Sequence, residues 1–143
     1  MKIKTKFHDQ IEITDKDILT FPKGIPGFED EKHFVLLDLM EPGTYKVLQS
    51  LKKNWVAFIM VSPWLFKSDY EFDLPESALE LLEVKTEKDI DVYNLLTIPK
   101  ELKNTTMNLM APVVIQQRKR LGMQVVLENV NYSTKYPIQI EGC

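Results

Sequence analysis

Hydrophobic and polar residues alternate at the start of the chain, and alternation with a period of two is typical of half-buried β-strands. Ile3, Thr5 and Phe7 lie on one side of such a strand, while the lysines between them lie on the other. Ile11 and Ile13 repeat the pattern a few residues later. We therefore expect the chain to begin with strands that bury one face.

Five later segments are predicted to be strands, because they are rich in β-branched and aromatic residues and end at turn residues. They cover residues 33–39, 45–51, 55–62, 92–98 and 105–115. The second and third are joined by Lys52-Lys53-Asn54, a spacing that predicts a β-hairpin. The last contains Pro112, which has no amide hydrogen to donate, so this segment must be bent, bulged or at a sheet edge.

A second hairpin is predicted from residues 113–117 and 123–128, which flank the basic tip Arg118-Lys119-Arg120-Leu121-Gly122. Residues 136–140 are predicted to form a short last strand. In Asp69-Tyr70-Glu71-Phe72-Asp73, acidic and aromatic residues alternate as they would in an edge strand or a half-exposed strand.

One helix is predicted near residues 75–84. Pro75 suits the first helical turn, where its missing amide hydrogen would have no partner, and Ala78, Leu79 and Leu82 recur on one face at helical spacing. About eight or nine short strands with a single helix predict an all-β fold, either a barrel or a sandwich. The length of 143 residues fits a single domain over residues 1–143.

The composition is that of a soluble globular protein, with 44% hydrophobic and 27% charged residues and a formal net charge of -3. No apolar run approaches the ~20 residues that a transmembrane helix needs, and no apolar segment typical of a signal peptide follows the first lysines. The single cysteine, Cys143, has no second cysteine with which to form an internal disulfide. We therefore expect a cytoplasmic protein.

Patterns typical of catalysis or metal binding are not found in the sequence. The two histidines have no spacing typical of a metal site or a catalytic triad, and there is no P-loop or dinucleotide-binding motif. Asp69, Glu71, Asp73 and Glu80 have the spacing of calcium ligands in a binding loop, but Leu74 occupies the position that requires glycine. We expect neither an enzyme nor a bound metal or cofactor.

Periodicity breaks in Phe21-Pro22-Lys23-Gly24-Ile25-Pro26-Gly27-Phe28-Glu29. Its prolines cannot donate ladder hydrogen bonds and its glycines accept positive φ, so we predict an ordered turn. Phe21, Ile25 and Phe28 have two interpretations. They either present rigid apolar contacts to a partner, at little cost in entropy, or plug one end of the barrel.

Charge is distributed unevenly along the chain. Residues 69–91 contain nine acidic and two basic residues, which gives this segment a charge of -7 and leaves +4 for the rest. The segment is either an ordinary solvated surface or an acidic patch that attracts a basic partner. We interpret the basic tip at Arg118–Arg120 as a hairpin turn whose charges protect a sheet edge, with RNA contact as the alternative.

Several separated motifs resemble those of the FliW family of bacterial flagellar assembly factors. The most specific are the FPKGIPGFE stretch at residues 21–29 and the NLMAPVVI stretch at residues 108–115. Weaker motifs lie at residues 48–50, 58–63, 69–71 and 124–127. They occur in the family order over nearly the whole chain. Gln116 departs from the pattern, because the family usually has asparagine there.

The resemblance implies a small, monomeric, β-barrel-like cytoplasmic protein that binds other proteins rather than catalysing a reaction. The implied partners are flagellin and CsrA, the RNA-binding repressor of flagellin translation, and the two compete. When flagellin is exported, the freed factor would remove CsrA from the flagellin message. The remaining alternatives are an RNA-binding or a small-molecule-binding β-barrel.

We predict a partner-binding surface that combines the acidic patch with positions of the family motifs. The expected residues are Phe21, Pro22, Gly24, Ile25, Pro26, Phe28, Glu29, Gln49, Asp69, Tyr70, Glu71, Asp73 and Asn108.

Overall fold

The computed structural model describes residues 1–40, 43–128 and 130–139. Its strands are β1 (Lys2–Lys4), β2 (Gln10–Glu12), β3 (Ile18–Thr20), β4 (His33–Asp38), β5 (Tyr45–Ser50), β6 (Ala57–Val61), β7 (Ile90–Thr97), β8 (Thr106–Met107), β9 (Val113–Gln116), β10 (Leu121–Gln124) and β11 (Tyr136–Pro137). The described residues contain one α-helix, α1 (Glu76–Leu81), and single 3-10 turns at Asp15–Asp17, Pro63–Leu65, Glu87–Asp89 and Leu102–Asn104.

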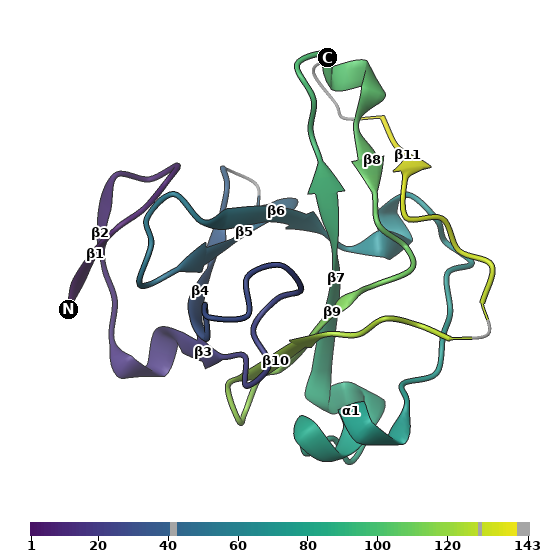
Figure 1. Ribbon diagram of the computed structural model, residues 1–143, viewed down its shortest axis with the longest axis horizontal. Coiled ribbons are helices and arrows are strands. Elements are labelled where there is room, and N and C mark those ends of the chain that lie inside the picture. The colour runs from purple at the N-terminus through teal and green to yellow at the C-terminus, as the bar shows by residue number, and fades with distance from the viewer. Residues whose placement is uncertain (41–42, 129, 140–143) are drawn as a thin grey trace.

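Within the described residues, seven strands close into a barrel in the order β7-β6-β5-β4-β3-β10-β9, because β9 pairs back onto β7 (Figure 1). Neighbouring strands run antiparallel, apart from β3 and β10, which pair in parallel. β8 and β11 extend the sheet beside the carboxyl end of β7. The predicted all-β fold with one short helix is confirmed, and its architecture is a barrel rather than a sandwich.

The strand β7 closes the barrel because its two halves use different partners. Residues 90–93 pair with β9, while Asn94 and Leu95 pair with β6. Leu96 and Thr97 then continue beyond the barrel to pair with β8. In Figure 1, β7 accordingly runs from the neighbourhood of α1 to the β8–β11 extension.

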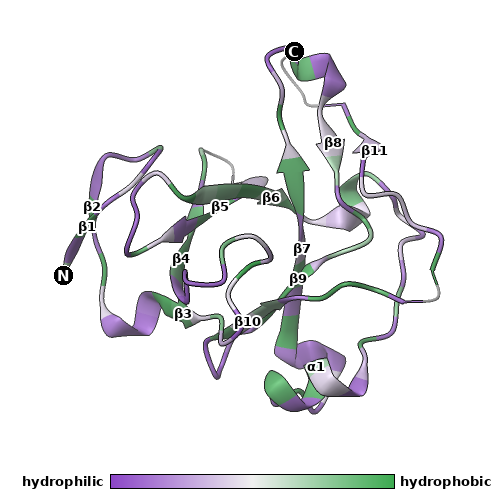
Figure 2. Cartoon of the chain, viewed as in Figure 1, coloured by the Kyte–Doolittle hydropathy of each residue, from purple (hydrophilic) through white to green (hydrophobic). Residues whose placement is uncertain are grey.

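Three apolar clusters hold these elements together. The first fills the barrel and includes Phe21 and Ile25 of the loop between β3 and β4, which lies within the ring of strands in Figure 1. The second packs on the outside of β9 and is covered by α1, residues 70–74 and the carboxyl-terminal segment. A small third cluster joins the β1–β2 hairpin to Val35. Figure 2 shows β6 as a hydrophobic strand and β7 as a strand of mixed hydropathy, while the β1–β2 hairpin is largely hydrophilic.

The predicted strand over residues 105–115 is interrupted between β8 and β9, as Pro112 led us to expect. The amide oxygen of Asn108 accepts hydrogen bonds from the backbone N–H groups of Met110 (3.0 Å) and Ala111 (3.2 Å). This side chain therefore satisfies backbone donors that the ladder leaves unpaired. The segment resumes as β9, whose four residues are all buried.

The prediction of a strand at residues 69–73 was wrong. The alternation arises because Tyr70 and Phe72 point inward and the acids point outward, but side chains rather than a neighbouring strand bind this backbone. The Tyr132 hydroxyl accepts from the Glu71 N–H (3.1 Å) and donates to the Glu71 carbonyl (2.8 Å). A period of two reports which residues are buried, and an extended segment without a ladder produces it as well.

Other element boundaries differ modestly from those predicted. The alternation at the start of the chain ends at Thr5, because Phe7 is 42% exposed. The strand after the basic tip was predicted over residues 123–128 but covers Leu121–Gln124, so it starts two residues early and ends four residues early. The strand β3 is too short for its periodicity to be recognised. The predicted last strand is reduced to Tyr136–Pro137, and its expected end at Ile140 lies outside the described residues.

Candidate partner-binding surfaces

The loop at residues 21–32 folds back through consecutive tight turns. The Gly24 N–H donates to the Phe21 carbonyl (2.8 Å), and the Phe28 N–H donates to the Ile25 carbonyl (2.6 Å). Gly24 has a φ of +65°, and a Cβ there would lie 2.7 Å from the backbone of Glu29. Only glycine fits this close approach, so the loop is an ordered structure, as the sequence predicts.

Of the three large apolar residues of this loop, two are buried and one is exposed. Phe21 and Ile25 are 0% and 1% exposed and belong to the cluster that fills the barrel. Phe28 is 42% exposed, and its ring packs edge-on against Phe58 with centroids 5.2 Å apart. The buried pair therefore plugs the barrel, which was one of our two interpretations. Phe28 has the accessible apolar ring that direct contact with a partner would need.

The other site residues predicted in this loop, three of them proline or glycine, differ in exposure. Pro26 and Glu29 are exposed, Pro22 is half-buried and Gly24 is buried. Glu29 accepts a hydrogen bond from the Gly27 N–H (2.8 Å), and this bond lowers the pKa of the Glu29 carboxyl. Glu29 is thus a fixed anion at the surface of the loop.

A buried carboxylate in this loop was not expected from the sequence. Glu31 is 2% exposed and accepts a hydrogen bond from the Ser50 hydroxyl (2.5 Å), while the Lys53 ammonium lies 3.6 Å away. These contacts fasten the loop to the β5–β6 hairpin. Glu31 lies in the charged run Glu29-Asp30-Glu31-Lys32, which in the sequence looks like ordinary solvated surface.

Gln49 and Asn108, two further predicted site residues, bind the chain's own backbone. Gln49 is fully buried, and its amide donates to the carbonyls of Ser50 (3.0 Å) and Asn54 (3.1 Å). Its oxygen accepts from the Lys6 N–H (2.9 Å), so it also attaches the β1–β2 hairpin to the barrel. These contacts give both residues a structural role, and any contact they make with a partner remains a prediction.

The acidic segment is held in place by an aromatic cluster. Tyr70 is 2% exposed, and its hydroxyl donates to the Leu109 carbonyl (2.6 Å). The Trp64 indole N–H donates to the Tyr70 carbonyl (2.7 Å), and the Tyr132 ring lies against the Tyr70 ring with centroids 4.7 Å apart. Tyr70 therefore anchors the segment, while Asp69, Glu71 and Asp73 remain exposed on its outer side.

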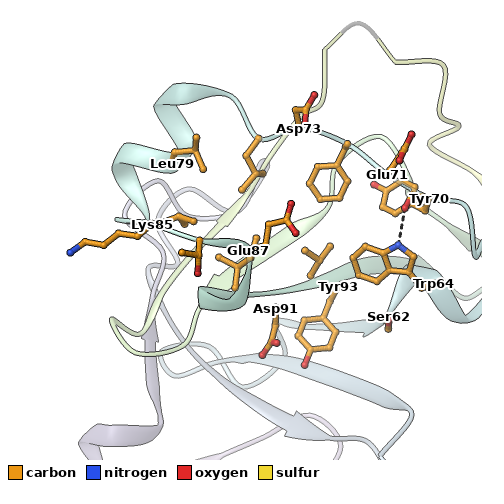
Figure 3. A pocket seen from close by; sticks show the side chains of 16 residues that line it. Ser62, Trp64, Tyr70, Glu71, Asp73, Leu79, Lys85, Glu87, Asp91 and Tyr93 are labelled. Atoms are coloured by element: carbon orange, nitrogen blue, oxygen red, sulfur yellow. Dashed lines mark hydrogen bonds between the residues drawn. The ribbon is translucent and has the colours of Figure 1, made fainter.

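A groove of about 840 Å³ lies beside this segment, and we call it the acidic groove (Figure 3). One wall is formed by residues 71–74 with Leu79 of α1, and the other by residues 84–87. Residues 90–93 of β7 form the floor, and Ser62, Trp64 and Tyr70 lie at one end. The apolar lining includes Trp64, Phe72, Leu74, Leu79, Val84, Ile90 and Val92.

The charges around the acidic groove are mainly negative. Glu71, Asp73, Glu87 and Asp91 line it, against one lysine among its lining residues, Lys85. Within the described residues, Glu71, Asp73 and Glu87 form no salt bridge. These carboxylates are therefore available to a cationic partner.

Other acids near the groove are already paired. Asp69 lies 3.0 Å from the Lys67 ammonium, which holds the pKa of the Asp69 carboxyl below its usual value. Backbone N–H groups of Thr86 and Lys85 lower the pKa of Asp89. Both groups are therefore firmly anionic at neutral pH.

The basic tip of the β9–β10 hairpin turns toward acceptors on the protein itself. Arg118 lies 3.6 Å from Asp89, and Lys119 lies 3.6 Å from Glu83. The Arg120 guanidinium donates to the Asp17 carbonyl (3.1 Å). Two cations of the tip therefore neutralise Glu83 and Asp89, which come after the groove acids Glu71 and Asp73 in the chain. The third cation, Arg120, points to a different part of the protein, so the three do not form one basic patch.

No group of three or more histidine, cysteine or acidic side chains in the described residues is arranged to hold a metal ion. In the same part of the chain, no helix is long and apolar enough to cross a membrane. The acidic groove and the loop at residues 21–32 combine exposed apolar side chains with fixed acidic groups, a composition suited to binding a protein.

Comparison with known proteins places these features in context. The family model described as "FliW protein" matches residues 2–138. The flagellar assembly factor FliW of Bacillus licheniformis is 45% identical over 143 residues, and that of Bacillus subtilis is 43% identical over 143 residues, each covering 100% of both chains. A crystal structure of the flagellar assembly factor FliW has a TM-score of 0.92 at 43% identity, with 100% of both chains covered.

Proposed function

This chain belongs to the FliW family of flagellar assembly factors, and from that premise we propose that it regulates flagellin supply by exchanging two protein partners. In this proposal it binds newly made flagellin in the cytoplasm. When flagellin is exported, the freed protein binds CsrA and relieves repression of flagellin translation. Because the two complexes draw on one pool, whatever favours one depletes the other.

The observation that carries the proposal is the set of groove carboxylates that form no salt bridge within the described residues, namely Glu71, Asp73 and Glu87. A protein that binds RNA needs a basic surface to neutralise phosphates, and such a surface is complementary to this patch. An acidic protein bound beside that surface would also repel RNA phosphates. It would therefore weaken RNA binding without covering every contact to the RNA.

Flagellin poses a different recognition problem, because the resemblance implies contact with its apolar, helix-forming terminal regions. The exposed Phe28 ring, fixed against Phe58 on an ordered loop, would offer an apolar contact that loses little entropy on binding. We place flagellin contact at the loop of residues 21–32 on this basis. Phe21 and Ile25 would contribute by holding the loop in shape.

Charge reversal tests the CsrA part of the proposal. Replacing Asp69, Glu71 and Asp73 with lysine should weaken CsrA binding by at least about tenfold and reduce its dependence on salt, because long-range attraction is lost. Calorimetric titrations over a series of salt concentrations measure both effects. The matched control replaces Glu12, Asp15 and Glu128, three exposed acids outside the segment, with lysine at the same change in net charge.

An unchanged affinity of the first variant across the salt series would contradict the proposal, and so would equal losses in the two variants. Partner exchange is tested separately with purified components. Flagellin added to a complex of this protein with CsrA should release CsrA in proportion to the flagellin added. A pull-down from the lysate of a flagellated host, in which neither protein copurifies, would argue against both contacts.

A further inference from the structure

We infer that the acidic groove holds a short basic amphipathic segment of a protein partner, with apolar side chains on the groove floor and lysine or arginine at the rim. The inference deepens the proposed function and rests on it only in taking the occupant to be part of a protein. The inference adds that the partner is recognised through apolar contacts in the groove. Attraction between a negatively and a positively charged surface would not be sufficient.

The floor and walls of the groove supply the apolar part of this recognition. Trp64 is 43% exposed, although its indole N–H donates to the Tyr70 carbonyl and its ring lies against the Tyr70 ring, so part of the ring stays accessible to an incoming side chain. Leu79 is half-buried on α1 and, unlike its neighbours Ala78 and Leu82, is not part of an apolar core cluster. Both side chains therefore offer apolar surface to the groove, in addition to the apolar residues of the floor.

The rim supplies the charged part. Glu71 and Asp73 lie on one wall, Glu87 on the other and Asp91 at the floor, as Figure 3 shows. A segment lying along the groove would therefore meet carboxylates on both sides of its apolar face. An amphipathic helix with cations flanking its apolar stripe has this arrangement.

The same charges argue against other occupants. Nucleic acids and the surfaces of anionic membranes are negatively charged, so the rim would repel both. The groove has a volume of about 840 Å³ and is bordered by carboxylates on both walls, which would repel an anionic small molecule as well. A cationic segment with several apolar side chains matches both the size and the charge.

The test uses a synthetic helical peptide of leucine and lysine with one apolar face, titrated into isotope-labelled protein and followed by NMR. Two control peptides are a scrambled sequence of the same composition, without an apolar face, and a leucine–glutamate counterpart. We expect the amphipathic cationic peptide alone to bind, with shift changes centred on residues 71–74, 79, 84–87 and 90–93. Changes spread over other surfaces, or equal binding by a control peptide, would overturn the inference.

Two substitutions separate local contact from general attraction. Leu79→Gln removes apolar surface from a half-exposed helical position without disturbing the core, and Glu87→Gln removes one rim charge without changing shape. Each substitution should weaken binding of the leucine–lysine peptide by about fivefold to tenfold. Glu76→Gln, in the same acidic segment but outside the groove, changes net charge by the same amount and should weaken it less than twofold. Equal losses for Glu76→Gln and Glu87→Gln would mean attraction by net charge alone and would refute the groove.

The same variants, tested against purified CsrA and flagellin, distinguish this inference from the proposed function. If neither protein binds while the peptide still occupies the groove, the partner exchange fails and the groove inference stands. If CsrA or flagellin binds and both Leu79→Gln and Glu87→Gln leave the affinities unchanged, the groove inference fails and the partner exchange stands.

Discussion

Tyr70 shows how a single side chain supports the binding surface from below. Its hydroxyl donates to the Leu109 carbonyl, its own carbonyl accepts from Trp64, and its ring contacts both Phe72 and Tyr132. The sequence places Tyr70 between two exposed acids, in a motif of the family, and we expected it to contact a partner. The structure shows that Tyr70 anchors the segment, and direct contact with a partner remains a prediction.

Replacing Tyr70 with phenylalanine should lower the free energy of unfolding by about 1–3 kcal/mol, because the buried Leu109 carbonyl loses its donor. Urea denaturation at neutral pH measures the loss. Tyr132→Phe is a useful comparison, because it removes an exposed pair of hydrogen bonds to Glu71 and should cost less. A Tyr70→Phe protein as stable as the parent would mean that the hydroxyl contributes nothing to holding the segment.

Tyr70 should also make stability depend on alkaline pH. Burial raises the pKa of its phenol to about 12 from an ordinary value of 10.0. Between these two pH values the unfolded chain releases the phenol proton and the folded chain retains it. The contribution of the Tyr70 hydroxyl to the free energy of unfolding is therefore fully present below pH 10.0 and is lost as the pH rises toward about 12. The difference in unfolding free energy between the parent and Tyr70→Phe should therefore shrink over this interval. Burial also raises the pKa of Tyr93, so the slope in the variant should be smaller but not zero.

Gly122 makes a close contact that the sequence pattern does not predict. A Cβ at this position would lie 2.3 Å from the Phe21 ring, so the glycine makes room for the plug of the barrel. Gly122→Ala should lower the unfolding free energy by about 1–3 kcal/mol through overpacking, measured by urea denaturation. Adding Phe21→Leu should recover part of that loss, because the smaller side chain relieves the contact. Strictly additive losses in the double variant would contradict this explanation.

At the level of elements, the loop at residues 21–32 combines two tasks that its sequence alone does not separate. Prolines and glycines predict an ordered turn, and the turn is found. Which of its apolar residues face inward depends on how the loop folds across the mouth of the barrel, and this is set by contacts distant in sequence, such as Glu31 with Ser50.

Alanine substitutions test this division. Ile25→Ala should destabilise the protein by about 2–5 kcal/mol, because a fully buried side chain is removed from the cluster that fills the barrel. Phe28→Ala should cost much less stability and should weaken flagellin binding. Thermal unfolding and binding measured on the same preparations provide the comparison. An Ile25→Ala protein with an unchanged melting temperature would contradict the plug.

The acidic segment shows where prediction from sequence stops at this scale. Charge counting located the acidic patch, and alternation correctly indicated which side of residues 69–73 faces inward. Neither could reveal the opposite wall of the groove, because residues 84–87 and 71–74 are brought together by the path of the chain around α1. Nor could they reveal the Tyr132 contact, which joins residues 61 positions apart.

At the level of the whole molecule, β9 lies between two apolar cores. Val113 and Ile115 belong to the cluster inside the barrel, while Val114 belongs to the cluster outside it. All four residues of the strand are buried. Loss of either core would therefore expose one face of a strand whose opposite face belongs to the other core. We therefore expect the two cores to unfold together.

The two tryptophans allow this expectation to be tested, because Trp55 lies in the β5–β6 turn and Trp64 lies beside the outer cluster. Two variants, Trp55→Phe and Trp64→Phe, each leave one fluorescent reporter. Urea transitions followed by fluorescence and by circular dichroism should coincide in both. Midpoints that differ between the reporters by more than the change in overall stability would indicate two independently unfolding parts.

Barrel closure is the feature of the whole molecule that the sequence left open. Counting strands could not distinguish a barrel from a sandwich, because closure depends on β7 dividing its pairing between β6 and β9. The parallel pairing of β3 with β10 joins segments about a hundred residues apart and has no local signal. The resemblance to a family supplied the barrel where periodicity could not.

The Tyr132 contact with the backbone of Glu71 has a consequence for how such a protein can diversify. Residues 69–73 keep their path through side-chain anchors and inward-facing rings, and not through a ladder that constrains every position. The outward-facing side chains are therefore free to change by mutation while the barrel stays intact. For protein engineering, this makes the segment a site where new specificity can be installed by altering a few exposed residues without redesigning the scaffold.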